Sequence, residues 1–97
     1  MTFVPDRLDD FMNLFRETSP RIRSFEGCQH LELWRDDRYP NVMTTYSIWD
    51  GPEKLDSYRQ SELFRETWER TRRMFAAPPK AFSHRRIIEV RSGPHIA

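Results

Sequence analysis

The chain has 97 residues and a mass of 11.8 kDa, enough for one domain and too little for a catalytic domain joined to a regulatory one. Its 16 basic and 15 acidic residues leave a net charge of +1, which gives no strong field to attract nucleic acid or an anionic membrane. One cysteine excludes an internal disulfide, and three glycines are too few for a glycine-rich phosphate loop.

The N-terminal quarter predicts a short apolar strand followed by a helix. Pro5 and Asp6 are typical of a helix start, and we expect Asp6 to be the N-cap. We expect Ser19-Pro20 to break or kink the helix and Gly27 to end it. Because the opening strand is so short, we also expect the natural chain to begin upstream of its present start. The apolar positions at helical spacing are Leu8, Phe11, Met12 and Phe15.

The middle of the chain predicts a β-hairpin. Residues 28–35 and 42–49 are rich in β-branched, aromatic and alternating apolar residues, and residues 36–40 supply the turn. Large side chains fall on both faces of these strands: Leu31 and Leu33 alternate with His30 and Trp34, and Tyr46 and Ile48 alternate with Met43 and Trp49. One face can pack on helices, and the other needs a further cover.

Two helices and a final strand are predicted after the hairpin. Asp50 is the expected cap of a helix that ends near Gln60, with Glu53 placed for a capping box. Ser61 is the expected cap of the next helix, in which Phe64, Trp68, Thr71 and Phe75 form an apolar stripe. Residues 81–90 read as the last strand, and residues 91–97 as a frayed tail.

This order of elements is an α+β, ferredoxin-like split βαβ pattern: one domain over residues 1–90, with an antiparallel sheet and helices on one face. The second apolar face of the hairpin favours burial against another copy, so we expect a homodimer that forms a dimeric α/β barrel.

Three segments carry a family resemblance: residues 22–28 (IRSFEGC), 46–50 (YSIWD) and 58–64 (YRQSELF). With the helix–hairpin–helix order, they resemble the antibiotic biosynthesis monooxygenases, small dimeric α+β barrels. The likeness runs from Phe3 to about His84. It implies the fold more strongly than the chemistry, because the family includes quinol oxygenases, haem-degrading enzymes and members of other roles.

The resemblance can be followed residue by residue. The tryptophan that ends the third strand in the family is present as Trp49. Quinol-oxidising members carry histidines where Tyr58 and Leu63 stand here, although Tyr58 keeps a phenol that can donate a hydrogen bond. Haem-degrading members place their iron-ligating histidine where Trp68 stands, and an indole cannot ligate iron. We therefore expect no haem, and no other cofactor or metal.

The candidate catalytic residues are Trp49, Tyr58 and His30. Glu32 lies two residues beyond His30 on the same face, so it can hold one imidazole tautomer and favour a general base. A hydrogen-bonded pair inside a dimer barrel is the more common role of such a pair. The expected substrate pocket, between helices and sheet, is lined by Phe15, Ser47, Phe64 and Trp68.

These residues favour a cofactor-free monooxygenase that acts on a phenolic, quinol or polycyclic aromatic small molecule. The alternatives are a non-catalytic binding or stress-response module that uses the same aromatic pocket, and a dimer whose pocket is filled by its own side chains. The expected partners are a second copy and a small aromatic molecule, with no nucleic acid and no membrane. Since no apolar run is long enough to span a membrane and the first residues lack a signal peptide's pattern, we expect a cytoplasmic protein.

Overall fold

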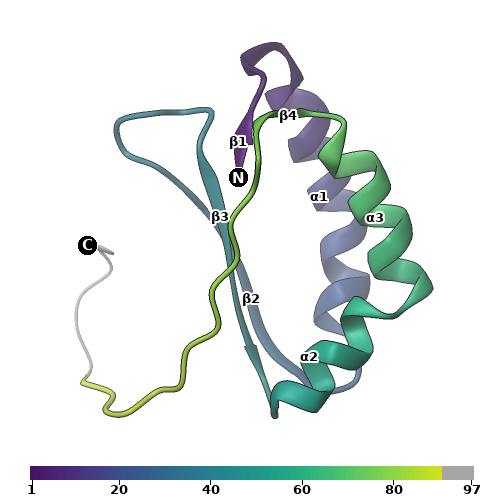
Figure 1. The fold of residues 1–97 in the computed structure, drawn as a ribbon, viewed down its shortest axis with the longest axis vertical. Helices are drawn as coiled ribbons and strands as arrows, with labels where there is room; N and C mark the ends of the chain where they lie inside the picture. The colour runs from purple at the N-terminus through teal and green to yellow at the C-terminus, as the bar shows by residue number, and fades with distance from the viewer. Residues whose placement is uncertain (91–97) are drawn as a thin grey trace.

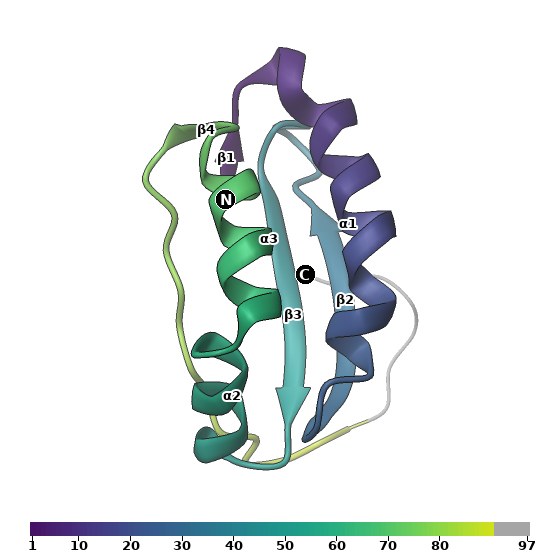
Figure 2. The same cartoon turned by 90° about the vertical axis from the view of Figure 1, so that its right-hand side faces the viewer.

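The fold places one layer of helices against an antiparallel sheet, as seen in a computed structural model that describes residues 1–90 (Figure 1). Figure 2 shows α1 on one side and α2 with α3 on the other, all on the same face of the strands. This arrangement confirms the predicted ferredoxin-like α+β class. The expected tail, residues 91–97, lies outside the described residues. The elements in chain order are β1 (Thr2–Phe3), the 3-10 turn η1 (Pro5–Arg7), α1 (Leu8–Arg23), β2 (Cys28–Arg35), β3 (Met43–Trp49), α2 (Pro52–Arg59), α3 (Glu62–Arg72) and β4 (Phe75–Ala77).

The strands lie in the order β4, β1, β3, β2, with β1 as the narrow link in the middle. β1 pairs antiparallel with β4, and β2 pairs antiparallel with β3. A single bridge from Thr2 to Val42 joins the two pairs, and the Phe3 amide donates to the Asn41 carbonyl at 2.9 Å. β1 therefore connects the sheet at one end, while most of β3 is paired only with β2.

The β2–β3 hairpin matches its prediction closely, and its register separates two faces. Leu33 pairs with Thr45 and packs on the core, so these residues face the helices. Direct partners share a face and successive residues alternate, so the neighbouring pairs point the other way. We call the side away from the helices the outer face; it carries His30, Glu32, Trp34, Thr44, Tyr46 and Ile48.

The core is small and gathers where β1 meets the helices. Phe3 is fully buried, its ring stacks on Phe11 at 4.3 Å between centroids, and it meets Phe75 at 5.3 Å. Leu14 of α1 and Met43 of β3 are 2% and 1% exposed, and Phe11 is 4% exposed. The Phe3 ring of the two-residue strand β1 therefore packs in one core with α1, β3 and β4.

One prediction about α1 is wrong, and of the break or kink expected at Ser19-Pro20 the break does not occur. Asp6 is not its cap: it lies inside η1, whose N-cap is Val4, and α1 then starts at Leu8 without a side-chain cap. Pro20 does not break the helix, which continues to Arg23. A proline removes only one amide donor, and burial of Ile22 in the last turn holds that turn on the core.

α1 ends at Arg23 with Ser24 as its C-cap, so the prediction that Gly27 ends the helix is wrong, and the turn that follows contains Gly27. Its φ of +90° is one that L side chains rarely adopt. A Cβ at Gly27 would also lie 2.5 Å from the Cβ of Lys54. The Gly27 carbonyl accepts a hydrogen bond from the Asp50 amide at 2.8 Å. Any side chain at position 27 would therefore push α2 away from the start of β2.

The predicted cap of α2 is wrong, and the predicted cap of α3 is confirmed. The residue that caps α2 is Gly51, without a side-chain bond, while the Asp50 carboxylate accepts from the Gln29 amide at 2.6 Å. The expected capping box with Glu53 is therefore absent. Ser61 caps α3 as predicted: its Oγ accepts from the Phe64 amide at 3.1 Å.

The last strand is misplaced by the sequence prediction. α3 ends at Arg72, and Phe75, expected on its stripe, begins β4. The Met74 carbonyl accepts from the Val4 amide at 2.9 Å, which draws the chain into the sheet before the prolines. Residues 81–90 have no regular secondary structure, because no strand within the described chain pairs with them.

Over residues 1–90, no helix has the length and apolar character needed to cross a membrane.

The Ser61 cap gives a direct test of this fold. Ser61→Ala should lower the free energy of unfolding by about 1 kcal/mol, since the Phe64 amide loses its acceptor. Ser57→Ala, an exposed change inside α2, is the matched control and should change it by less than about 0.5 kcal/mol. Equal losses in urea denaturation of the two variants would contradict the capping role.

Candidate functional site

A continuous series of aromatic rings runs along the helix side of the sheet. Trp49 at the end of β3 stacks on Tyr58 of α2, with centroids 5.1 Å apart and planes 23° apart. Tyr58 meets Phe64 edge-on at 5.2 Å, and Phe64 stacks on Trp68 at 5.9 Å. We call this series, with its two end members, the aromatic row: Phe25, Trp49, Tyr58, Phe64, Trp68 and Phe75.

The sequence locates four of these rings, and the other two come from tertiary structure. Phe25 lies in the turn after α1 and touches both Trp49 and Tyr58, at 6.4 and 5.4 Å between centroids. Phe75, which lies in β4, contacts Trp68 with ring centroids 5.6 Å apart. Its place in the row follows from the early end of α3, which helical spacing cannot indicate. The signal for Phe25 was its i, i+3 relation to Ile22, which puts both on the core side.

The rings of the row are half-buried rather than enclosed. The Trp49 indole Nε1 donates to Ser47 Oγ at 3.0 Å, and Ser47 itself is exposed. This bond fixes the indole against β3 while leaving the serine hydroxyl in contact with solvent. The row therefore offers aromatic surface next to a hydroxyl group, a combination that can hold a flat molecule with a polar edge.

Tyr58 is a hydrogen-bond donor across the ordinary pH range. Burial raises the pKa of its phenol to about 12, with a smaller contribution from Cys28. Burial also raises the pKa of the Cys28 thiol, so that group stays neutral too. Neither side chain can serve as a base at neutral pH, but a neutral phenol can donate to an oxyanion.

His30 lies on the outer face, away from Trp49 and Tyr58. It pairs with Ile48 in the hairpin register, and its ring meets Tyr46 at 6.0 Å. Its Nε2 lies 2.6 Å from Glu32 Oε2, and this hydrogen bond is the main reason that the pKa of the Glu32 carboxyl is lowered. The predicted His30–Glu32 pair therefore exists, but the structure does not bring it to the other two candidate catalytic residues.

Phe15, Ser47, Phe64 and Trp68 were expected to line one pocket, and they do not all meet. Phe15 joins the row only through the core, since its nearest ring is Phe11 at 6.1 Å. Phe64 and Trp68 belong to the row, and Ser47 borders it through Trp49. The expected set thus divides into a row with a polar neighbour and one core residue on α1.

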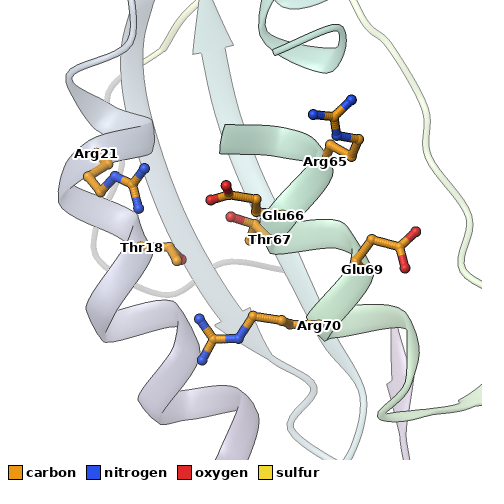
Figure 3. A pocket seen from close by; sticks show the side chains of 7 residues that line it. All are labelled: Thr18, Arg21, Arg65, Glu66, Thr67, Glu69 and Arg70. Carbon is orange, nitrogen blue, oxygen red and sulfur yellow. The ribbon is translucent and has the colours of Figure 1, made fainter. Parts of the chain in front are cut away.

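Two open cavities lie on the polar side of the helix layer, and no residue of the row lines either one. The larger, about 450 Å³, lies between α1 and α3 and is lined by arginines, glutamates and threonines, among them Arg21, Glu66 and Arg70 (Figure 3). Arg70 reaches towards Glu17 of α1 at 3.4 Å. The smaller, about 380 Å³, also includes Arg70. Within residues 1–90, no three His, Cys, Asp or Glu side chains gather where they could hold a metal ion.

Comparison with known proteins identifies relatives of the fold. Residues 1–70 match the family model described as antibiotic biosynthesis monooxygenase. A conserved protein from Methanosarcina mazei Go1 is 21% identical with a TM-score of 0.76, covering 79% of this chain and 76% of its own. An antibiotic biosynthesis monooxygenase is 19% identical with a TM-score of 0.74, covering 79% and 81%. A protein from Bordetella bronchiseptica, provisionally identified as such a monooxygenase, is 24% identical with a TM-score of 0.80, covering 91% of each chain. No curated protein matches the chain at a significant level.

The raised pKa of Tyr58 predicts how stability changes with pH. The folded protein favours the neutral phenol, so an unfolded chain with the ordinary pKa of 10.0 releases the proton first as pH rises. This contribution to stability is complete below pH 10.0 and is lost as pH approaches about 12. Between about pH 9 and about pH 11, the native protein should lose more unfolding free energy than Tyr58→Phe does. Urea titrations at the two pH values measure this loss. If the native protein and Tyr58→Phe lose the same free energy of unfolding, the Tyr58 phenol is not shielded from water.

Proposed function

The chain belongs to the antibiotic biosynthesis monooxygenase family, and we propose that it is a cofactor-free monooxygenase that acts on a phenolic, quinol or polycyclic aromatic small molecule. The observation that carries the proposal is the stacked pair of Trp49 and Tyr58 with Ser47 at its edge. A flat aromatic substrate gains most from stacking on such rings, and its hydroxyl finds a donor and an acceptor there.

The reaction needs no electron source besides the substrate. A phenol that carries a ring C–H reacts with O₂ to give a quinone and water. One oxygen atom becomes the new carbonyl, the other leaves as water, and the substrate gives up four electrons and two hydrogen atoms. The protein's part is to favour the electron-rich phenolate and to hold it with O₂ in an apolar setting.

Tyr58 is the residue best placed to favour that phenolate. Its neutral phenol lies within the row, and a donor in a half-buried site stabilises an oxyanion more than water does. Since neither Tyr58 nor Cys28 is ionised at neutral pH, the substrate's proton passes to solvent. Trp49 acts through position: its stack and its bond to Ser47 orient the bound ring.

A second candidate function rests on a different observation. The rings of the row contact one another along their length, so the row is already well packed without a ligand. Such a surface suits a module that binds an aromatic compound without transforming it. If a second copy covers the row, its own side chains fill the site, which was the third alternative.

Oxygen uptake by dihydroxynaphthalenes, anthrones and quinols tests the catalytic proposal. The protein should raise uptake above the uncatalysed rate, and a chelator should not change it. Tyr58→Phe should lower kcat/KM by roughly 10²-fold, as expected when one oxyanion donor is lost. Tyr39→Phe, in an exposed turn (57% exposed), is the matched control and should leave the rate unchanged. Trp49→Phe should cost less than Tyr58→Phe, because it keeps a ring.

Fluorescence titration separates the two candidate functions. A binding module should show saturable quenching by the same compounds without oxygen uptake, and Trp49→Phe should reduce that quenching. Neither uptake nor quenching with any compound of the panel would refute both functions.

We also propose that the outer face is covered by a second copy of the chain. Trp34 stacks on Tyr46 there at 4.8 Å and 17°, and Ile48 extends the apolar surface. A monomer that leaves such a surface in water loses hydrophobic stabilisation, and a two-fold dimer buries it with one self-complementary contact.

Solution mass tests the dimer. Light scattering at micromolar concentration should give roughly twice the chain mass of 11.8 kDa. Trp34→Glu, which puts a charge in the centre of the outer face, should shift the mass to that of one chain. Arg16→Glu, on an exposed position of α1, is the control and should not change the mass. A native chain that remains a monomer would refute the dimer.

A further inference from the structure

The larger cavity, between α1 and α3, is a candidate binding site separate from the aromatic row. Its volume of about 450 Å³ falls within the range of pockets that hold small molecules. Its lining comes from these two helices alone and consists of arginines, glutamates and threonines, with no aromatic ring. Such a lining favours a polar ligand, unlike the flat aromatic compound expected at Trp49 and Tyr58.

Two ion pairs that the helix spacing favours are not formed beside this cavity. Glu17 precedes Arg21 by four residues on α1, and Glu66 precedes Arg70 by four residues on α3. This spacing, with the acidic residue first, is the most favourable one for an ion pair along a helix. The structure instead joins Glu17 to Arg70 across the two helices, and neither Arg21 nor Glu66 forms an ion pair with a described residue.

The contact between Glu17 and Arg70 is long. Its two nitrogen–oxygen distances are 3.4 and 3.5 Å, whereas a charge-assisted hydrogen bond of this kind is typically about 2.8 Å. Both side chains are more than half exposed. A ligand carboxylate can therefore replace Glu17 on the Arg70 guanidinium without breaking a strong bond.

The other two charged residues of the lining are already paired along α3. Arg65 pairs with Glu62, and Glu69 accepts from Arg72 at 3.0 Å. Figure 3 shows the Arg65 and Glu69 side chains turned away from α1. The charges that a ligand would meet inside the cavity are therefore those of the remaining three residues.

These three side chains converge from the two helices. In Figure 3 the guanidinium groups of Arg21 and Arg70 and the carboxylate of Glu66 all turn into the space between α1 and α3. Arg21 and Glu66 face each other across that space from opposite helices, yet they form no ion pair. A gap thus separates two opposite charges that a ligand of suitable length could join.

Two threonines add hydroxyl groups to the same space. Thr18 of α1 is 3% exposed, and its hydroxyl donates to the Leu14 carbonyl at 2.9 Å, so its oxygen is still able to accept. Thr67 of α3 is half-buried and also lines the cavity. These groups can receive the hydrogens of an ammonium group or donate to a carboxylate.

The arrangement of charges indicates a ligand that carries both signs. Two guanidinium groups bind a carboxylate well, but the Glu66 carboxylate repels a ligand that has negative charge only. A ligand with positive charge only is repelled by Arg21 and Arg70 in the same way. A zwitterion avoids both repulsions, because each of its charged groups meets the opposite charge.

We propose that this cavity binds a small zwitterion, an amino acid or another amine that carries a carboxylate. Arg21 and Arg70 hold the carboxylate, and Glu66 holds the ammonium group. Such a ligand connects α1 to α3, so the stability of the folded chain rises with the ligand concentration. The site is independent of the proposed oxygenase chemistry and of the proposed dimer.

NMR titration of the full-length protein at constant ionic strength tests the proposal. The probes are glycine, β-alanine and γ-aminobutyrate, which differ in the distance between their two charges. At least one should shift the amide signals of Thr18 and Thr67 in a saturable way and raise the melting temperature. Butyrate and butylammonium each carry one charge of γ-aminobutyrate, and both should bind at least about tenfold more weakly than the best zwitterion.

Matched variants locate the binding site. Arg21→Gln and Glu66→Gln should each raise the dissociation constant by about tenfold or more, because each removes one charge-assisted contact. Arg65→Gln alters the same lining at a residue already paired with Glu62, and it should raise the constant by less than about threefold. All three positions are exposed, so the variants should fold, and their melting temperatures without ligand check this.

Three results would overturn the proposal. Butyrate that binds as tightly as the best zwitterion would make this an anion site. Saturable shifts confined to Trp49 and Tyr58 would place the zwitterion on the aromatic row. Absence of saturable shifts with all three zwitterions would refute the site itself, and oxygen uptake by the aromatic panel would be unaffected by any of these results.

Discussion

The phenyl ring of Phe3 is the contact on which the rest of the structure depends. It stacks on Phe11 of α1, meets Phe75 of β4, and its backbone bonds both the Asn41 carbonyl and the Asn41 side-chain amide. Within residues 1–90, the two strand pairs share no other bridge than the one beside it, at Thr2. In a chain with 37% hydrophobic residues, one fully buried ring lies at this crossing, beside the backbone hydrogen bonds between Met1 and Met43 that also join the two strand pairs.

The same narrow link explains why the aromatic row is only half-buried. β1 has two residues, so the sheet is complete at one end and thin along most of β3. Rings near the complete end enter the core through Phe75, while rings farther away, such as Trp49 and Tyr58, rest on each other and on α2. One continuous series of rings therefore has its strongest packing at one end and accessible aromatic surface at the other, and the proposed function uses that accessible end.

Sequence reasoning predicts well the parts whose partners are close in the chain. The hairpin boundaries and the Ser61 cap both follow from local patterns. It fails where a tertiary contact competes with a local signal. Asp50 has the chemistry of a cap, yet its carboxylate binds Gln29 across the hairpin, and Phe75 fits a helical stripe, yet β1 draws it into a strand. Alternation predicts that a hairpin has two faces but not which face meets the helices, so sequence alone could not show that His30 lies apart from Trp49 and Tyr58.

The misplaced final strand is the most informative of these differences. Residues 81–90 have the composition of a strand, and in an isolated chain they remain extended, exposed and unpaired. β-propensity measures how well side chains fit a pleated surface, and it takes effect only when a neighbouring edge supplies that surface.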